Sequence, residues 1–64
     1  MGLGDTSALE PLIILLQDEN PVVRRMTVRA LSAIGGKTVE GALKSALETE
    51  TDVDVKDAII QALQ

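Results

Sequence analysis

The feature that most constrains this chain is a helical hydrophobic pattern that occurs four times. In each of four segments, largely apolar residues recur at spacings of three and four, which places them on one face of an α-helix. The four stripes are Leu9, Leu12, Ile13 and Leu16; Val23, Met26, Thr27, Ala30, Leu31 and Ile34; Val39, Ala42, Leu43, Ala46 and Leu47; and Val55, Ala58, Ile59, Ala62 and Leu63. The pattern predicts helices over residues 7–18, 21–34, 38–49 and 53–63.

Residues that start and stop helices fall between these stripes. The expected N-caps are Ser7, which has capping-box spacing to Glu10, then Asn20 ahead of Pro21, then Thr38, and finally Asp52. Gly35-Gly36 is expected to end the second helix.

The two halves of the chain resemble each other. Residues 12–16 align with residues 43–47 at an offset of 31, and Val23-Arg24 aligns with Val55-Lys56 at an offset of 32. The sequence therefore predicts an all-α fold, an α-solenoid segment of two antiparallel helix pairs. Residues 1–64 would form a single domain, with repeats over 5–35 and 36–64. A closed four-helix bundle is the alternative, because it has the same stripes and short loops.

The first half carries a recognisable set of residues. They are residues 8–13 (ALEPLI), Leu15-Leu16, Asp18, Asn20-Pro21, Val23-Arg24, Ala30-Leu31 and Ile34-Gly35. This pattern resembles the HEAT-like repeats of the bilin-lyase type, and the resemblance extends over residues 5–64. The second repeat departs from the pattern at Gly41-Ala42 and Lys56. The resemblance implies a protein-binding α-solenoid, in which Asp18 and Arg24 tie turns to neighbouring repeats.

Composition excludes several classes of function. The chain has no Cys, no His and no aromatic residue, so thiol or imidazole catalysis, usual zinc sites and base stacking are excluded. Its net charge of −4 argues against nucleic acid and anionic membranes as partners. We expect no catalytic residue, no cofactor and no metal site, in a cytoplasmic protein.

Some apolar residues lie outside the stripes. Ile14 and Leu15 flank the first stripe, and Val28 and Ile60 occupy equivalent positions in the second and fourth segments. Since two repeats share only one joint, one of Val28 and Ile60 should lack a covering neighbour. All four are candidates for self-association, either in a homo-oligomer or in a larger array; tolerated surface exposure is the alternative.

Charged residues suggest a second surface. The face of the second helix with Val22, Arg25 and Arg29 should lie beside a face of the fourth helix. The residues expected on that neighbouring face are Asp54, Asp57 and Gln61. In a HEAT-like stack these faces line the concave side, where partners bind. The functional interpretation is a site for an anion or an acidic peptide. The structural alternative is a lateral ion pair of Arg25 with Asp57 or Asp54.

Together these features predict a non-enzymatic protein–protein interaction scaffold. One alternative is a fragment or accessory subunit of a bilin-lyase-like enzyme, and another is a designed or minimised repeat protein without native activity.

Overall fold

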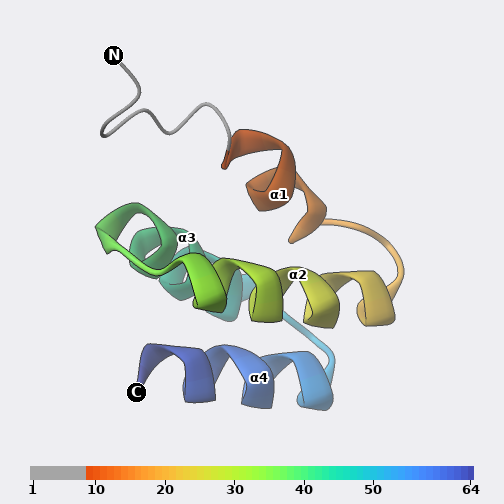
Figure 1. The fold of residues 1–64 in the computed structure, drawn as a ribbon. Helices are drawn as coiled ribbons and strands as arrows, with labels where there is room; N and C mark the ends of the chain where they lie inside the picture. The colour runs from red at the N-terminus through yellow and green to blue at the C-terminus, as the bar shows by residue number, and fades with distance from the viewer. Residues whose placement is uncertain (1–8) are drawn as a thin grey trace.

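The computed structural model describes residues 9–64, which contain four helices and, over this range, no strand (Figure 1). The helices are α1 (Glu10–Leu15), α2 (Pro21–Ile34), α3 (Lys37–Thr49) and α4 (Val53–Leu63).

The helices form two layers, each a helix hairpin. α1 pairs with α2 and α3 pairs with α4, while α2 and α4 lie side by side and run in the same direction (Figure 1). α2 contacts all three other helices and is the centre of the arrangement. The fold is therefore the α-solenoid segment expected from the repeat, rather than a closed four-helix bundle.

The starts of α2 and α4 follow from their N-capping residues. Asn20 Oδ1 accepts a hydrogen bond from the Val22 amide at 2.9 Å, and Pro21 is the first helical residue. Asp52 Oδ1 accepts from the amides of Asp54 and Val55 at 2.8 and 3.1 Å. Both caps satisfy amides that have no partner inside the helix, and both helices have the spans predicted from the sequence.

The ends of α1 differ from the prediction. Ser7 and the start of the predicted helix 7–18 lie outside the described residues, and the helix then ends at Leu15. The amides of Leu16, Gln17 and Asp18 bond to carbonyls three residues back, at 3.1, 3.0 and 3.1 Å. These tighter bonds replace the α-helical ones, so the final turns of the predicted helix become a non-α-helical turn.

The prediction that Thr38 caps the third helix is wrong, because α3 begins one residue earlier, at Lys37. Gly35 ends α2 and Gly36 precedes α3, with φ values of +72° and +98°. Other residues rarely adopt such φ values. The two glycines therefore turn the chain within two residues and leave no room for a separate cap.

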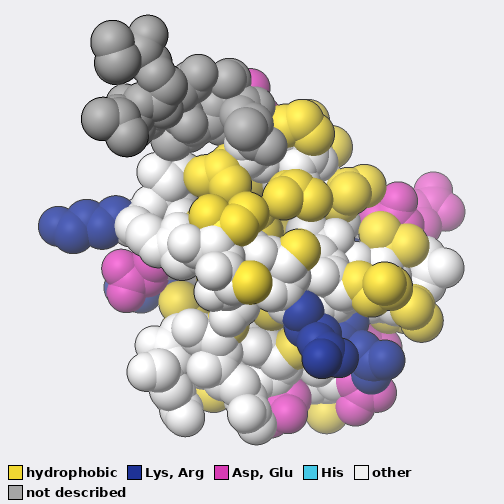
Figure 2. Space-filling model, viewed as in Figure 1, with side chains coloured by type: hydrophobic (Ala, Val, Ile, Leu, Met, Phe, Trp, Pro, Cys, Tyr) yellow, Lys and Arg dark blue, Asp and Glu magenta, His cyan; other side chains and the backbone are white. Residues whose placement is uncertain are grey.

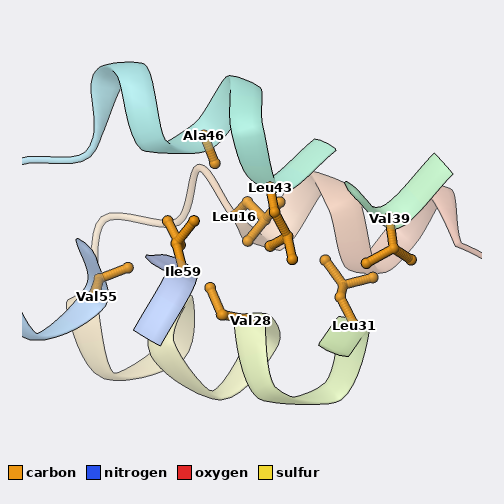
Figure 3. Packing of buried hydrophobic residues seen from close by; sticks show 8 residues of the cluster. All are labelled: Leu16, Val28, Leu31, Val39, Leu43, Ala46, Val55 and Ile59. Atoms are coloured by element: carbon orange, nitrogen blue, oxygen red, sulfur yellow. The ribbon is translucent and has the colours of Figure 1, made fainter. Parts of the chain in front are cut away.

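The core lies between the two hairpins (Figure 3). Its buried apolar residues are Leu16, Val28, Leu31, Val39, Leu43, Ala46, Val55 and Ile59. Thr27 is buried beside them, and its hydroxyl donates to the Val23 carbonyl at 2.7 Å. All four helical segments thus contribute to the core, although within α1 proper no residue is buried.

Among the self-association candidates, Val28 is wrong. Its side chain is 1% exposed and faces α4, whereas that of Ile60 is 43% exposed. The expectation that one of this equivalent pair lacks a covering neighbour is confirmed. Ile14 and Leu15 are exposed, as expected.

The second apolar stripe is only partly buried. Met26 and Ile34 are 63% and 55% exposed, and Ala30 is also exposed. The stripe is wider than the surface that α1, α3 and α4 cover. Met26 and Ala30 lie at the outer edge of the stripe, whereas Ile34 is the last residue of α2.

Adjacent isoleucines on α4 test this packing. Ile59→Val should lower the free energy of unfolding by about 0.5–1.5 kcal/mol, because it removes a methylene from a filled core. The matched change Ile60→Val should stay within about 0.5 kcal/mol, because that side chain is half exposed. Urea unfolding followed by circular dichroism measures both, and equal losses would contradict the assignment of faces.

Candidate binding groove and the joint between repeats

A groove runs between α2 and α4, with a volume of about 690 Å³. Arg25 and Arg29 line its α2 side, and Asp54, Asp57 and Gln61 line its α4 side. Figure 2 shows basic side chains over α2 next to acidic side chains over α4. The structure thus brings together five of the six residues predicted to form the partner-binding face.

Helical spacing explains how each wall arises. Arg25 and Arg29 are four residues apart on α2, and Asp54, Asp57 and Gln61 are three and four residues apart on α4. Each set therefore lies on one side of its helix. Between the walls, Val28, Ala58 and Ala62 line the groove. The two alanines are small, which leaves space between the charged walls.

Val22, the sixth predicted residue, lies beside the groove rather than in it. It lines an adjoining depression of about 90 Å³ together with Pro21, Arg25 and Asp54. Val22 is exposed there and extends the α2 wall toward the start of the helix. The predicted residues thus line the groove and its margin at the start of α2.

The charges of the two walls do not pair with each other. Within residues 9–64, the ion pair shorter than 4.0 Å is Arg24–Glu50, so the expected lateral pair of Arg25 with Asp54 or Asp57 is not formed. On the α4 wall, Gln61 Nε2 donates to Asp57 Oδ2 at 3.5 Å. The groove therefore has one basic wall and one acidic wall, both exposed to solvent.

Arg24 joins the two repeats at the turns that precede α2 and α4. Its Nε and Nη2 donate to Glu50 Oε1 and Oε2, both at 2.9 Å, in a bidentate pair. Its Nη1 donates to the carbonyls of Asp18 and Glu19 at 2.6 and 3.2 Å. One guanidinium thus holds the turn of the first hairpin against that of the second, which confirms a structural role for Arg24.

Glu50 completes this contact. Its side chain is 4% exposed, and Oε2 also accepts from the amides of Thr51 and Asp52 at 3.1 and 2.9 Å. Burial favours the neutral acid, but the hydrogen bonds from Arg24, Asp52 and Thr51 outweigh it and lower the pKa of Glu50. The hydrogen bonding between Arg24 and Glu50 also raises the pKa of Arg24.

Sequence reasoning missed Glu50, although a signal was present. Glu50 occupies in the second repeat the position of Asp18 in the first, at the offset of 32. Asp18 Oδ2 accepts from the Asn20 amide at 2.9 Å, just as Glu50 accepts from the Asp52 amide. The repeat alignment therefore marked Glu50 as a turn residue, and its longer side chain also reaches Arg24.

The remaining chemistry of residues 9–64 is limited. No cluster of three or more potential metal ligands occurs in this range, and no buried side-chain polar atom there lacks a hydrogen bond. None of the helices in the described part of the chain is long and apolar enough to cross a bilayer.

Comparison with known proteins identifies the repeat. A family model described as HEAT repeats matches residues 2–64. An uncharacterized protein in the gldA 3′ region of Geobacillus stearothermophilus is 36% identical over 61 residues. An epoxyqueuosine reductase of Listeria monocytogenes is 46% identical over 52 residues. No solved structure matches the chain significantly.

The two relatives are much longer than the matched segments. The alignments cover 94% and 80% of this chain but only 28% and 14% of the Geobacillus and Listeria proteins, respectively.

The pH dependence of stability tests the Arg24–Glu50 contact. Because folding lowers the pKa of Glu50, its stabilising contribution is present above its ordinary value of 4.5 and is lost as pH falls through the lower folded value. Glu50→Gln should therefore lower Tm at pH 7, and the difference from wild type should shrink as the pH drops below 4.5.

The exposed Glu48, near the end of α3, supplies the matched control. Glu48→Gln should change Tm little at any of these pH values. A Tm difference for Glu50→Gln that stays constant from neutral to acidic pH would exclude the ionised contact as its cause.

Proposed function

Because the chain belongs to the HEAT repeat family, we propose that it is a non-enzymatic module that binds a partner protein in the groove between α2 and α4. The supporting observation is that the basic and acidic walls face each other without forming an ion pair within the described residues. A partner segment with an acidic and a basic side chain can satisfy both walls at once.

The chemistry of the walls defines the partner more closely. Arg25 and Arg29 can each donate several hydrogen bonds to a carboxylate, in forks that favour bidentate contacts. Asp54 and Asp57 can accept from a lysine or arginine of the same segment. Val28, Ala58 and Ala62 between them suit a short apolar side chain. The expected ligand is thus a peptide segment with mixed charge, as part of a protein.

Mixed charge also distinguishes this partner from nucleic acid. Phosphate backbones require mainly basic surfaces, because binding depends on neutralising many phosphates. Here the acidic wall would repel phosphates that the basic wall attracts. The net charge of −4 acts in the same direction.

The resemblance to enzyme-associated repeats leads to the same function. The reductase relative is matched over 14% of its length, and this chain contains neither Cys nor His. We therefore assign to the repeat a binding role beside catalytic partners, rather than a catalytic role of its own. If the chain is instead an accessory subunit of a bilin-lyase-like enzyme, the same lack of Cys and His assigns it a binding role there too.

Peptide selection tests the groove directly. Peptides selected from a random display library against the wild-type chain should carry both an acidic and a basic residue. Their binding should shift the amide signals of Arg25, Arg29, Asp54, Asp57 and Gln61. The double variant Arg25→Glu/Arg29→Glu should weaken binding by about tenfold or more, since hydrogen bonds to charged groups contribute about 1.5–3 kcal/mol.

The double variant Lys37→Glu/Lys44→Glu is the matched control, because it makes the same charge change on exposed positions of α3. It should retain the wild-type affinity, measured by fluorescence anisotropy. Equal losses of peptide affinity in both double variants would show that the effect comes from net charge and not from the groove. Shifts confined to another face would rule out the groove.

A further inference from the structure

The charges of the groove change along its length as well as across its width. α2 and α4 run in the same direction (Figure 1), and the repeat offset of 32 sets which of their residues lie at the same level. The three levels, from the helix starts to the helix ends, are Val22 with Asp54, Arg25 with Asp57, and Arg29 with Gln61. The first level thus carries an acidic side chain alone, the second carries one of each sign, and the third carries a basic side chain alone.

Two depressions at the ends of the groove confirm this alignment of the helices. The depression at the helix starts is lined by Val22 of α2 and Asp54 of α4. The depression at the helix ends, with a volume of about 310 Å³, is lined by Ser32 of α2 and Ala62 of α4. The starts of the two helices therefore lie together, and so do their ends.

The charges next to the groove do not reverse this order. Near the helix starts, Arg24 is already paired with Glu50, and the remaining charge that lines the depression there with the groove residues is the carboxylate of Asp52. Near the helix ends, Lys37 and Glu40 line the second depression with one charge of each sign. The groove is therefore acidic at the helix starts and basic toward the helix ends.

The acidic and basic ends are about two helical turns apart. Asp54 and Gln61 are separated by seven residues of α4, or about 10 Å at 1.5 Å per residue, and Arg29 lies at the level of Gln61. Side chains seven residues apart also lie on the same side of an α-helix. A partner helix along the groove can therefore place one charged side chain at each end.

The walls of the groove suit a helix better than an extended segment. Both walls are helices, whose backbone groups bond within the helix, and residues 9–64 contain no strand whose edge could pair with an extended chain. Among the residues that line the groove, Gln61 alone carries a side-chain amide, and this amide already donates to Asp57. An extended segment would find few partners for its backbone groups, whereas a helix satisfies its own.

The helix dipole selects one direction for such a partner. A helix is stabilised by acidic side chains in its first turn and by basic side chains in its last turn. A helix with these charges matches the groove only when it starts beside Arg29 and ends beside Asp54. It then runs opposite to α2 and α4, which places its positive end beside the negative ends of both.

We propose that the groove binds a partner helix antiparallel to α2 and α4, with an acidic side chain in its first turn beside Arg29 and a basic side chain seven residues later beside Asp54. The apolar side chains between these two charges pack on Val28 and Ala58. This inference rests on the proposed function, because it specifies the partner of the same groove.

Two peptides of identical composition test the charge order. One is an alanine-rich helix with Glu in its first turn and Lys seven residues later, and the other has this Glu and Lys exchanged. The wild-type chain should bind the first peptide about tenfold more tightly at low salt, because the exchange turns an exposed attraction at each end into a repulsion. Fluorescence anisotropy measures both affinities.

The double variant Arg29→Glu/Asp54→Lys is the control, because it reverses the order of the groove charges and leaves the net charge unchanged. It should prefer the second peptide. Since the same two peptides are compared, this reversal does not come from a difference in their own helix stability. Circular dichroism verifies that the variant is folded.

A nitroxide label on the peptide tests its direction. An N-terminal label should broaden the amide signals of Ser32 and Ala33, and a C-terminal label those of Val22 and Asp54. Equal affinities of the two peptides, a preference that the double variant leaves unchanged, or the opposite broadening would overturn the inference. If library peptides bind the groove and neither helical peptide does, this inference alone fails; if nothing binds the groove, the proposed function fails with it.

Discussion

The contact between Arg24 and Glu50 determines how the two hairpins sit together. It is a bidentate pair at 2.9 Å across the joint, and both partners also bond to turn backbone. The turn before α2 and the turn before α4 are therefore fixed to each other. Because these turns start α2 and α4, the contact aligns the two helices at the same end. Since α2 and α4 carry the two walls of the groove, this alignment also sets the positions of the walls relative to each other.

The structure also shows that burial depends on the neighbouring repeat as much as on the residue. Val28 and Ile60 are equivalent β-branched residues, yet among the described residues only Val28 is covered by the helix of a neighbouring repeat. Likewise, Ala46 is buried beneath the first hairpin, whereas Leu15, its equivalent, is exposed. The described residues thus contain one completed joint between repeats, and burial is greatest on the two surfaces that meet there.

Much of this fold could be predicted from local sequence. The starts of α2 and α4 follow from Asn20, Pro21 and Asp52, because caps act within one turn of the chain. The end of α1 could not be predicted in this way, because Leu16 continues the apolar spacing although its amide, like those of Gln17 and Asp18, bonds to the carbonyl three residues back. Thr38 failed as a cap because the backbone of Gly36 had already begun the helix.

The site was predicted less completely, for a related reason. Arg25, Arg29, Asp54, Asp57 and Gln61 share a groove because helix periodicity and the repeat offset determine their sides. Periodicity alone did not show that these walls remain unpaired, since that depends on the spacing of α2 and α4. Periodicity also placed Met26 and Ile34 on an apolar stripe, but a stripe records which side of a helix is apolar and not whether a neighbour covers it.

A double-mutant cycle with Arg24→Gln and Glu50→Gln tests the central contact most directly, because it isolates the energy that depends on both side chains. If Arg24 and Glu50 hold the joint together, the double variant should be more stable than the sum of the two single losses predicts. In both single variants, the amide signals of Arg25 and Asp57 should also move. Strictly additive losses, with those signals unchanged, would contradict the claim that this pair aligns the two repeats.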